Sequence, residues 1–445
     1  MLESVEKLLE EKKYKEAKIE LNKLNSSDVA ELLEDIDSKE IIKIFRLINK
    51  DKAAEVFAYL PVEQETEIIG LLTDKEAVSL LDDMYADDAV DLLEEMPSNV
   101  VRRLLKQCTR ETRNDINKLL NYPENSAGSI MTVEYAELKE GLTIKQAIEN
   151  LRKEIEYYET INTCFVVNAE RKLIGYIHLK DIICANEEDL VKNIVKKDVI
   201  FCKTTDDQEE AAMMFQKYDL TAMPVVDSED RMVGIITIDD IMDVLQEENT
   251  EDIEKMAAIN PGNNKTYLKT SIFETWKSRI PWLMILMLSA TFTGKIIESY
   301  EQALTSYVIL TAFIPMLMGS AGNAGGQASV TIIRSLSLGD IEFKDIGKVI
   351  WKEFRVALLC GFTLSAVNIV KLMLIDRVIF KVALVVSLTL LVTVIISKLI
   401  GCALPILVKK IKLDPAVMAS PIITTIIDAL SLVIYFQIAT HLLGI

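Results

Sequence analysis

The chain has 445 residues, half of them hydrophobic, and its 68 acidic side chains outnumber the 49 basic ones to give a formal net charge of -19. A chain this acidic would repel a phosphate backbone, which excludes nucleic-acid binding as a first interpretation. The charge is unevenly divided: residues 1–255 hold 58 acidic and 32 basic side chains, and residues 256–445 hold 10 and 17. The sequence therefore predicts an acidic soluble region followed by an apolar, slightly basic membrane region.

The cysteines and histidines exclude two further classes of site. The six cysteines are scattered without a Cys-x-x-Cys pair, which indicates a reducing compartment and no disulfide framework. Two histidines are too few for a His-based zinc or iron site. The N-terminal residues are highly charged and contain no secretory signal, so we expect the acidic region to be cytosolic.

The first region, residues 1–128, contains an internal repeat. Pairs of apolar residues recur every twelve residues, from Leu32-Leu33 to Leu104-Leu105. Twelve residues make a two-turn helix and a corner, which is stable only when neighbours stack, so we predict an all-α helical solenoid. Such an array is typical of an interaction scaffold. Residues 51–100 also hold fourteen carboxylates against two lysines, and divalent cations would relieve the resulting repulsion.

Residues 129–245 contain a duplicated pattern of strand, turn, glycine-containing strand and helix. The first copy has its strands at Thr163–Val167 and Leu173–Ile177, and the second at Ala222–Val226 and Met232–Ile236. The pattern resembles a tandem pair of CBS domains, an α/β module that often binds adenine nucleotides. The resemblance implies that ATP could bind this pair, with Asp239 contacting the ribose.

The second copy is also strongly acidic. Residues 201–255 carry sixteen carboxylates against four cations, and Asp240 and Asp243 share one face of a helix. The solenoid and this module therefore present two acidic surfaces. We expect divalent cations to hold these surfaces together.

A connector at residues 246–275, interrupted at Asn260-Pro261-Gly262, leads to a membrane region at residues 276–445. Ten Lys and Arg residues flank the spans on the side of the membrane where the N-terminus lies, and four flank them on the opposite side. By the positive-inside rule the N-terminus is cytoplasmic, and an odd number of spans makes the C-terminus extracytoplasmic. The five predicted spans lie at about 280–297, 303–334, 355–375, 379–408 and 416–443.

The second span holds a run of small and polar residues, Pro315–Gln327. Its four glycines are explained by close helix packing, but Asn323 and Gln327 would be costly against lipid. We therefore predict that Asn323 faces a polar path.

The last span contains Asp428, the only acidic residue in the middle of a predicted span. A carboxylate in the membrane marks an ion pathway unless a cation pairs with it. Thr424 and Thr425 lie on or near the same helix face, and Asp414 would stand at the cytosolic mouth. Oxygen ligands of this kind favour Mg²⁺ or Ca²⁺, and a two-fold dimer would bring two copies of Asp428 together.

The order of the parts, together with Gly322–Gln327 and the stretch from Asp414 to Tyr435, resembles the MgtE family of magnesium channels. The resemblance implies a homodimer in the lipid bilayer whose pore lies on the two-fold axis, with a plug helix in the connector. It also implies closure by cytosolic Mg²⁺. Ser420 and Gly326 depart from residues found in some relatives. The regulatory ligands that the resemblance implies are Asp88 or Asp91 on the solenoid, Asp207, Glu209, Asp219, Asp240 and Asp243 on the CBS pair, and Glu251 and Asp252 on the plug.

The resulting interpretation is a multi-domain membrane protein that moves Mg²⁺ inward down its electrochemical gradient and is closed by cytosolic Mg²⁺. It is not an enzyme, because the chain has no phosphate-binding G-x-x-x-x-G-K-[ST] loop and no nucleophile paired with histidine. Two alternatives remain: a membrane-anchored CBS sensor of nucleotides or ions that does not conduct, and a transporter of Co²⁺, Ni²⁺ or Ca²⁺.

Overall fold

A computed structural model describes residues 5, 7–9, 11, 13–34, 36, 38–262, 267–268, 270–411, 413–418 and 420–444. They form two compact units, Met1–Gln246 and Glu247–Ile445.

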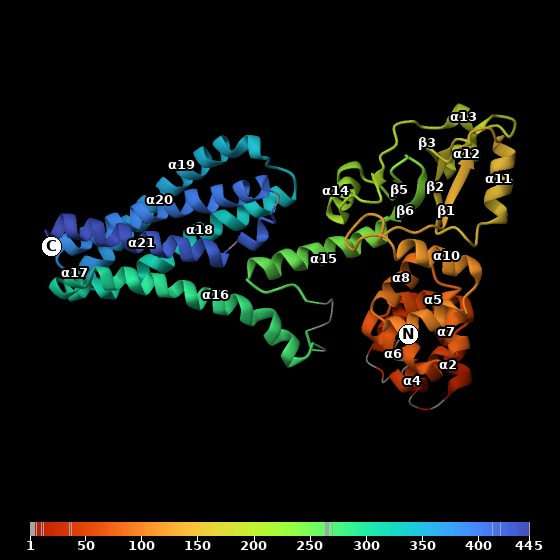
Figure 1. The fold of residues 1–445 in the computed structure, drawn as a ribbon, viewed down its shortest axis with the longest axis horizontal. Helices are drawn as coiled ribbons and strands as arrows, with labels where there is room; N and C mark the ends of the chain where they lie inside the picture. Colours follow the sequence, from red (N-terminus) through yellow and green to blue (C-terminus); the bar gives the residue numbers. More distant parts are fainter. Residues whose placement is uncertain are drawn as a thin grey trace. The chain divides into compact units, whose positions relative to one another are not determined.

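The first unit begins with the predicted solenoid of short helices (Figure 1). Each helix from α3 to α8 packs against the helix two positions further along the chain, and the apolar pairs of the twelve-residue repeat, such as Leu80 and Leu81, lie in one shared core. The repeat therefore specified the fold, because no helix of 8 to 10 residues buries its apolar face alone. The helices are α2 (Tyr14–Leu21), α3 (Ser26–Glu34), α4 (Ser38–Phe45), α5 (Lys50–Ala58), α6 (Val62–Leu71), α7 (Asp74–Leu81), α8 (Ala86–Glu94), α9 (Ser98–Leu105) and α10 (Arg110–Leu119).

Two small α/β repeats follow, as the duplicated pattern predicts. Each contains a three-stranded sheet in which the first pair of strands is parallel and the second antiparallel. The first repeat contains β1 (Tyr135–Lys139), α11 (Ile144–Lys153), β2 (Thr160–Val167), β3 (Leu173–His178), α12 (Leu179–Cys184) and α13 (Val191–Ile194). The second contains β4 (Cys202–Lys203), α14 (Gln208–Tyr218), β5 (Ala222–Val226), β6 (Met232–Thr237) and the long helix α15 (Ile238–Met256).

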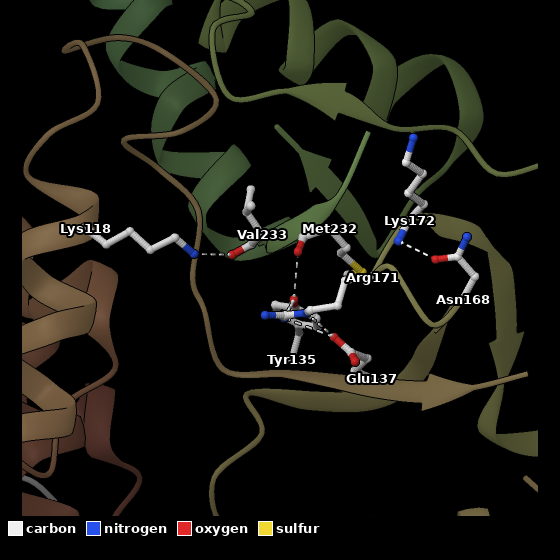
Figure 2. Close-up of polar contacts among 8 residues, drawn as sticks. All are labelled: Lys118, Tyr135, Glu137, Asn168, Arg171, Lys172, Met232 and Val233. Atoms are coloured by element: carbon white, nitrogen blue, oxygen red, sulfur yellow. Dashed lines mark hydrogen bonds and ion pairs between the residues drawn. The ribbon is translucent and has the colours of Figure 1, made fainter. Parts of the chain in front are cut away.

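Polar contacts join the two repeats to each other and to the solenoid (Figure 2). The Tyr135 hydroxyl donates to the Met232 carbonyl at 3.3 Å, and Arg171 donates to that hydroxyl at 2.8 Å. From the end of the solenoid, Lys118 Nζ donates to the Val233 carbonyl at 3.0 Å. A continuous apolar core also runs from the solenoid into the second repeat, including Leu92. The solenoid is therefore packed directly on the repeat that carries the densest carboxylates.

The second unit contains five helices that are long and apolar enough to cross a membrane, counted over the described residues. The fold class, a helical solenoid, an α/β pair and a five-helix membrane region, is therefore confirmed. Helices α18 to α21 pack side by side, and α16 packs against α21 (Figure 1). The elements are α16 (Ile272–Ser299), α17 (Glu301–Ser306), η1 (Val308–Phe313), α18 (Ile314–Ser337), η2 (Phe343–Asp345), α19 (Ile346–Leu374), α20 (Phe380–Lys410), η3 (Ala416–Met418) and α21 (Ser420–Leu443).

Glycines allow three of the membrane helices to pack closely. A Cβ on Gly401 of α20 would stand 2.3 Å from the Gly325 carbonyl oxygen of α18, and a Cβ on Gly325 would stand 2.2 Å from Ile427 Cδ1 of α21. We predict that Gly401→Ala lowers the free energy of unfolding by about 1–3 kcal/mol, because overpacking forces the helices apart. Thermal unfolding of the full chain in detergent measures this. Gly347→Ala is the matched control, since a Cβ there meets nothing within 4 Å; equal effects of the two changes would contradict the packing explanation.

Candidate functional site

The membrane unit places the carboxylate of Asp428 beside a glycine of the neighbouring helix. Asp428 Oδ1 lies 3.9 Å from the position that a Cβ on Gly322 of α18 would take, and Thr424 Cγ2 lies 3.4 Å from it. Gly322 therefore leaves room between α18 and α21 at the level of this carboxylate. The sequence predicted a role for Asp428 and for the glycine-rich run separately, and the structure brings the two together.

Asp428 pairs with neither Lys371 of α19 nor Lys398 of α20. Lys371 lies 3.0 Å from Asp376, and Lys398 of α20 lies 3.8 Å from Glu353 of α19, both nitrogen-to-oxygen distances. Across the described part of the chain, Asp428 makes no hydrogen bond or ion pair with a protein group. A half-buried carboxylate in a membrane helix without a protein cation is the arrangement expected where the cation comes from solution.

The hydroxyls near Asp428 are engaged locally. Thr424 and Thr425 both donate to the Pro421 carbonyl, at 3.0 and 2.9 Å, and Thr425 Oγ1 also lies 3.5 Å from Ser289 Oγ of α16. Each hydroxyl oxygen keeps a lone pair with which it could accept a hydrogen bond from a water molecule. The two threonines are therefore suited to contact a hydrated ion.

One face of α18 exposes polar side chains within a membrane span. Asn323, Gln327, Thr331 and Arg334 follow one another at helical spacing, and all four are exposed. Gly322 and Gly325, by contrast, are buried against neighbouring helices. The glycines thus serve packing, whereas the amides form a polar face that needs water or another protein surface.

In the first unit, carboxylates from the solenoid and the α/β repeats gather into one group, which we call the acidic cluster. Carboxylate oxygens of Glu159, Asp239 and Asp240 lie within 4.8 Å of one another. Thr237 donates to Asp240 Oδ2 through its backbone nitrogen and its hydroxyl, at 3.3 and 2.5 Å. The members of the acidic cluster are Asp87, Asp88, Glu134, Glu159, Asp239, Asp240 and Asp243.

The electrostatics of the acidic cluster are unfavourable without a counterion. Burial, followed by repulsion from Asp239, raises the pKa of Asp88 to about 6. Burial also raises the pKa of Asp240 to about 7 and, with repulsion from Asp240, that of Glu159 to about 8. Asp87, 7% exposed, has a pKa well above its ordinary value for the same reasons. Protons or a cation must neutralise these groups when the solenoid packs on the repeats.

These shifts predict a pH dependence with a definite sign. A free carboxyl group titrates near pH 4, so between about pH 4 and 8 the packed form binds more protons than the separated form. With a chelator present, packing of the solenoid on the repeats is therefore favoured at low pH and lost as the pH rises through about 6 to 8. The first thermal transition of the full chain should fall over this range in EDTA and stay level with Mg²⁺. A transition that rises with pH in EDTA would contradict this.

The far end of α15 carries the next group of predicted residues, and these lie in the membrane unit. Lys255 Nζ lies 2.6 Å from both Glu251 Oε1 and Asp414 Oδ2. Asp252 accepts a hydrogen bond from Ser337 at 3.4 Å, and Met256 packs with apolar residues of α18 and η3. Burial and the nearby Asp414 raise the pKa of Asp252. Asp414 thus lies at the attachment of α15 to the membrane helices.

Two further predicted regulatory residues lie at the ends of α14. Asp207 caps α14 by accepting from the Glu209 backbone nitrogen at 2.8 Å, and Asp219 ends that helix with a left-handed φ of 51°. Neither belongs to the carboxylate group that the described residues form within 4.8 Å. Asp91 lies beside buried Glu65, whose pKa burial and the charges of Asp88 and Asp91 raise to about 9.

Sequence reasoning missed three members of the acidic cluster. Glu134 accepts a hydrogen bond from the Ala86 backbone nitrogen at 3.2 Å and so links the first repeat to α8. Glu159 immediately precedes β2, and its buried Oε2 has no hydrogen-bond partner among the described residues. Asp87 adjoins the predicted Asp88. Only Asp87 had a local signal, the acidic run 87–91, because the other two are distant in sequence from the acids they meet.

The donors of the acidic cluster suit a hard divalent cation. They are carboxylate oxygens from four separate segments of the chain, and the buried Glu159 Oε2 has no hydrogen-bond partner among the described residues and is left to accept one ligand. Oxygen donors of this kind fit Mg²⁺ or Ca²⁺ and not softer metals.

Comparisons with known proteins cover most of the chain. Residues 314–438 match the family MgtE, described as a divalent cation transporter, residues 24–125 match the MgtE intracellular N domain, and residues 127–188 and 191–247 match CBS domains. A magnesium transporter MgtE of Thermus thermophilus is 36% identical over 77% of this chain and 75% of its own, and one of Bacillus subtilis is 37% identical over 72% and 70%. This chain is also similar to a crystal structure of the cytosolic domain of the Mg²⁺ channel MgtE in complex with ATP. The match has a TM-score of 0.52 and 32% sequence identity, and it covers 55% of this chain and 100% of that one.

Proposed function

Because the chain belongs to the MgtE family of divalent cation transporters, and not to a family of enzymes, we propose that it conducts Mg²⁺ into the cell through a pore lined by Asp428. The observation that carries this proposal is the carboxylate of Asp428, which lies beside Gly322 and forms no ion pair with any described cation. Asn323, Thr424, Thr425 and Asp414 complete the proposed path. The alternative is that the protein transports Co²⁺, Ni²⁺ or Ca²⁺. Measuring whether each of these ions reduces Mg²⁺ flux tests this alternative.

The membrane potential and the Mg²⁺ gradient supply the energy for transport. Moving two charges inward across 100 mV releases about 4.6 kcal/mol, so no ATP hydrolysis is required. Proteoliposomes that contain a Mg²⁺-sensitive dye and a potassium gradient with valinomycin test this directly. We expect uptake to rise when the interior is made negative and to need no ATP; uptake that depends on added ATP would refute this mode of transport.

We further propose that two copies form the pore on a two-fold axis. One carboxylate in each chain is a weak site for a divalent ion, and two copies of Asp428 would double the local charge. The exposed polar face of α18, which includes Asn323 and Gln327, supports this, since a water-filled path between two chains would solvate it.

Cytosolic Mg²⁺ closes this proposed pore through α15. The first turns of that helix carry Asp240 and Asp243 of the acidic cluster, and its last turns carry Glu251, Asp252 and Lys255 beside the membrane helices. Mg²⁺ bound in the cluster would relieve the repulsion between the solenoid and the repeats, and the continuous helix would transmit the change. Asp91, Asp207, Glu209 and Asp219 are proposed as further ligands.

The proposed arrangement has a cytoplasmic N-terminus, an extracytoplasmic C-terminus and four parts. These are residues 1–128 as the solenoid, 129–245 as the CBS pair, 246–275 as the plug and 276–445 as the membrane domain. ATP is a candidate ligand of the CBS pair, supported by the similar cytosolic domain in complex with ATP. Asp239, exposed at the start of α15, is the proposed ribose ligand. A sensor that does not conduct would explain the CBS pair but leaves Asp428 without a role.

A further inference from the structure

A cavity lies at the start of the first membrane helix, outside the proposed pore. Its volume is about 510 Å³, and its walls come from the first three turns of α16 and from Tyr267, Leu268 and Thr270 just before them. The walls are mostly apolar, including Trp276, and Arg279 supplies the one charged side chain among the described lining residues. This is the composition of a site for a molecule with an apolar body and a negatively charged end.

The cavity stands where α16 enters the apolar part of the membrane. Residues 272–279 mix apolar and polar side chains, and the uncharged stretch 280–294 begins immediately after Arg279. Trp276 is 59% exposed, Tyr267 74% and Leu268 94%. Exposed aromatic rings next to a cation, at the end of a membrane span, are characteristic of the boundary between lipid headgroups and acyl chains.

Asn260, seven residues before Tyr267, makes two contacts with α16. The Asn260 backbone nitrogen donates to the Ser278 carbonyl at 2.9 Å, and Trp282 Nε1 donates to Asn260 Oδ1 at 2.9 Å. The chain therefore turns back along the first turns of α16 before entering the membrane. Tyr267 and Leu268 line the cavity together with Trp276 and Arg279.

The charge of the membrane region indicates which kind of molecule fills the cavity. The residues from 256 onward carry ten acidic and seventeen basic side chains, so the membrane region of a second copy offers few carboxylates with which to neutralise Arg279. A phospholipid phosphate is anionic, and its acyl chain matches the apolar wall formed by Ile280 and Leu283. Free phosphate would use the guanidinium but none of that wall.

We propose that this cavity binds an anionic phospholipid, with the phosphate against Arg279 and the first part of an acyl chain along Ile280 and Leu283. Trp276 and Tyr267 flank the headgroup. One cation at an anionic membrane surface is worth a preference of about fivefold for an anionic over a zwitterionic lipid. The proposal is independent of what the protein transports.

Fluorescence quenching tests this in the full-length protein. The chain has three tryptophans, so Trp282→Phe with Trp351→Phe leaves Trp276 as the only fluorophore. This protein is reconstituted in phosphatidylcholine vesicles in which an increasing fraction of the lipid is replaced by brominated phosphatidylglycerol or, in a parallel series, by brominated phosphatidylcholine. We expect half-maximal quenching of Trp276 at an about fivefold lower fraction of the brominated phosphatidylglycerol.

Three variants make the result specific. Arg279→Gln should abolish the preference and Arg279→Lys should keep most of it. Lys277→Gln should keep most of the preference, because Lys277 carries the same charge two residues away but does not line the cavity. The proposal is overturned if both lipids quench Trp276 equally or if neither does. It is also overturned if the preference survives Arg279→Gln or if Lys277→Gln abolishes it.

Discussion

Replacing Asp428 by Asn should reduce Mg²⁺ flux through the reconstituted protein at least about tenfold. The substitution keeps the size of the side chain and removes its charge. A unit charge about 5 Å from a hydrated divalent ion contributes about 1.7 kcal/mol even at the dielectric constant of bulk water, and more in a narrow path. A dimer would lose this stabilisation twice. Flux of Mg²⁺ into dye-loaded proteoliposomes measures the effect.

Asp376→Asn is the matched control for this prediction. It removes the same charge from the same unit, but from a side chain that pairs with Lys371 instead of facing α18. We expect its flux to remain close to that of the parent protein. If Asp428→Asn conducts as well as Asp376→Asn, Asp428 does not line the path.

Neutralising both sides of the acidic cluster should remove inhibition by cytosolic Mg²⁺. Asp88→Asn takes one carboxylate from the solenoid, and Asp240→Asn takes one from the start of α15. At about ten times its dissociation constant, a cation that binds only the closed form stabilises it by about 1.4 kcal/mol, a shift of about tenfold. The double variant should lose this shift, so its conductance should stay high when cytosolic Mg²⁺ is raised.

The control for the double variant is Glu149→Gln combined with Glu170→Gln. These two exposed carboxylates lie on the first CBS repeat, and their replacement removes the same total charge. Inhibition by Mg²⁺ should persist in this protein. If the two double variants respond alike, net charge and not the acidic cluster controls the response.

The fold was predictable where a pattern repeats along the chain. Leu80 and Leu81 are one example of the apolar pairs that recur every twelve residues and fill the solenoid core. Gly234 lies in the second of the two similar strand pairs of the α/β repeats. Long apolar runs revealed the five membrane helices in the same way. In each case local sequence determines local burial, so no knowledge of distant contacts is needed.

The sites were predictable only in part, because they depend on which segments meet. Asp428 was recognisable alone, since a charge in a membrane helix is costly wherever it lies. Glu134 and Glu159 join the acidic cluster only because the solenoid packs on the repeats. The pairing of Lys398 with Glu353 was likewise hidden, because Glu353 lies just outside the predicted third span whereas α19 begins at Ile346.

The most direct test of the account is the current through an inside-out membrane patch while Mg²⁺ on the cytosolic face is varied. With Mg²⁺ on the other face and a potential that drives it inward, we predict a Mg²⁺ current when the cytosolic face is bathed in chelator. The same current should close when millimolar Mg²⁺ is added to that face and should be absent in Asp428→Asn. A patch that contains the protein but carries no Mg²⁺ current, or a current that cytosolic Mg²⁺ leaves unchanged, would contradict the account.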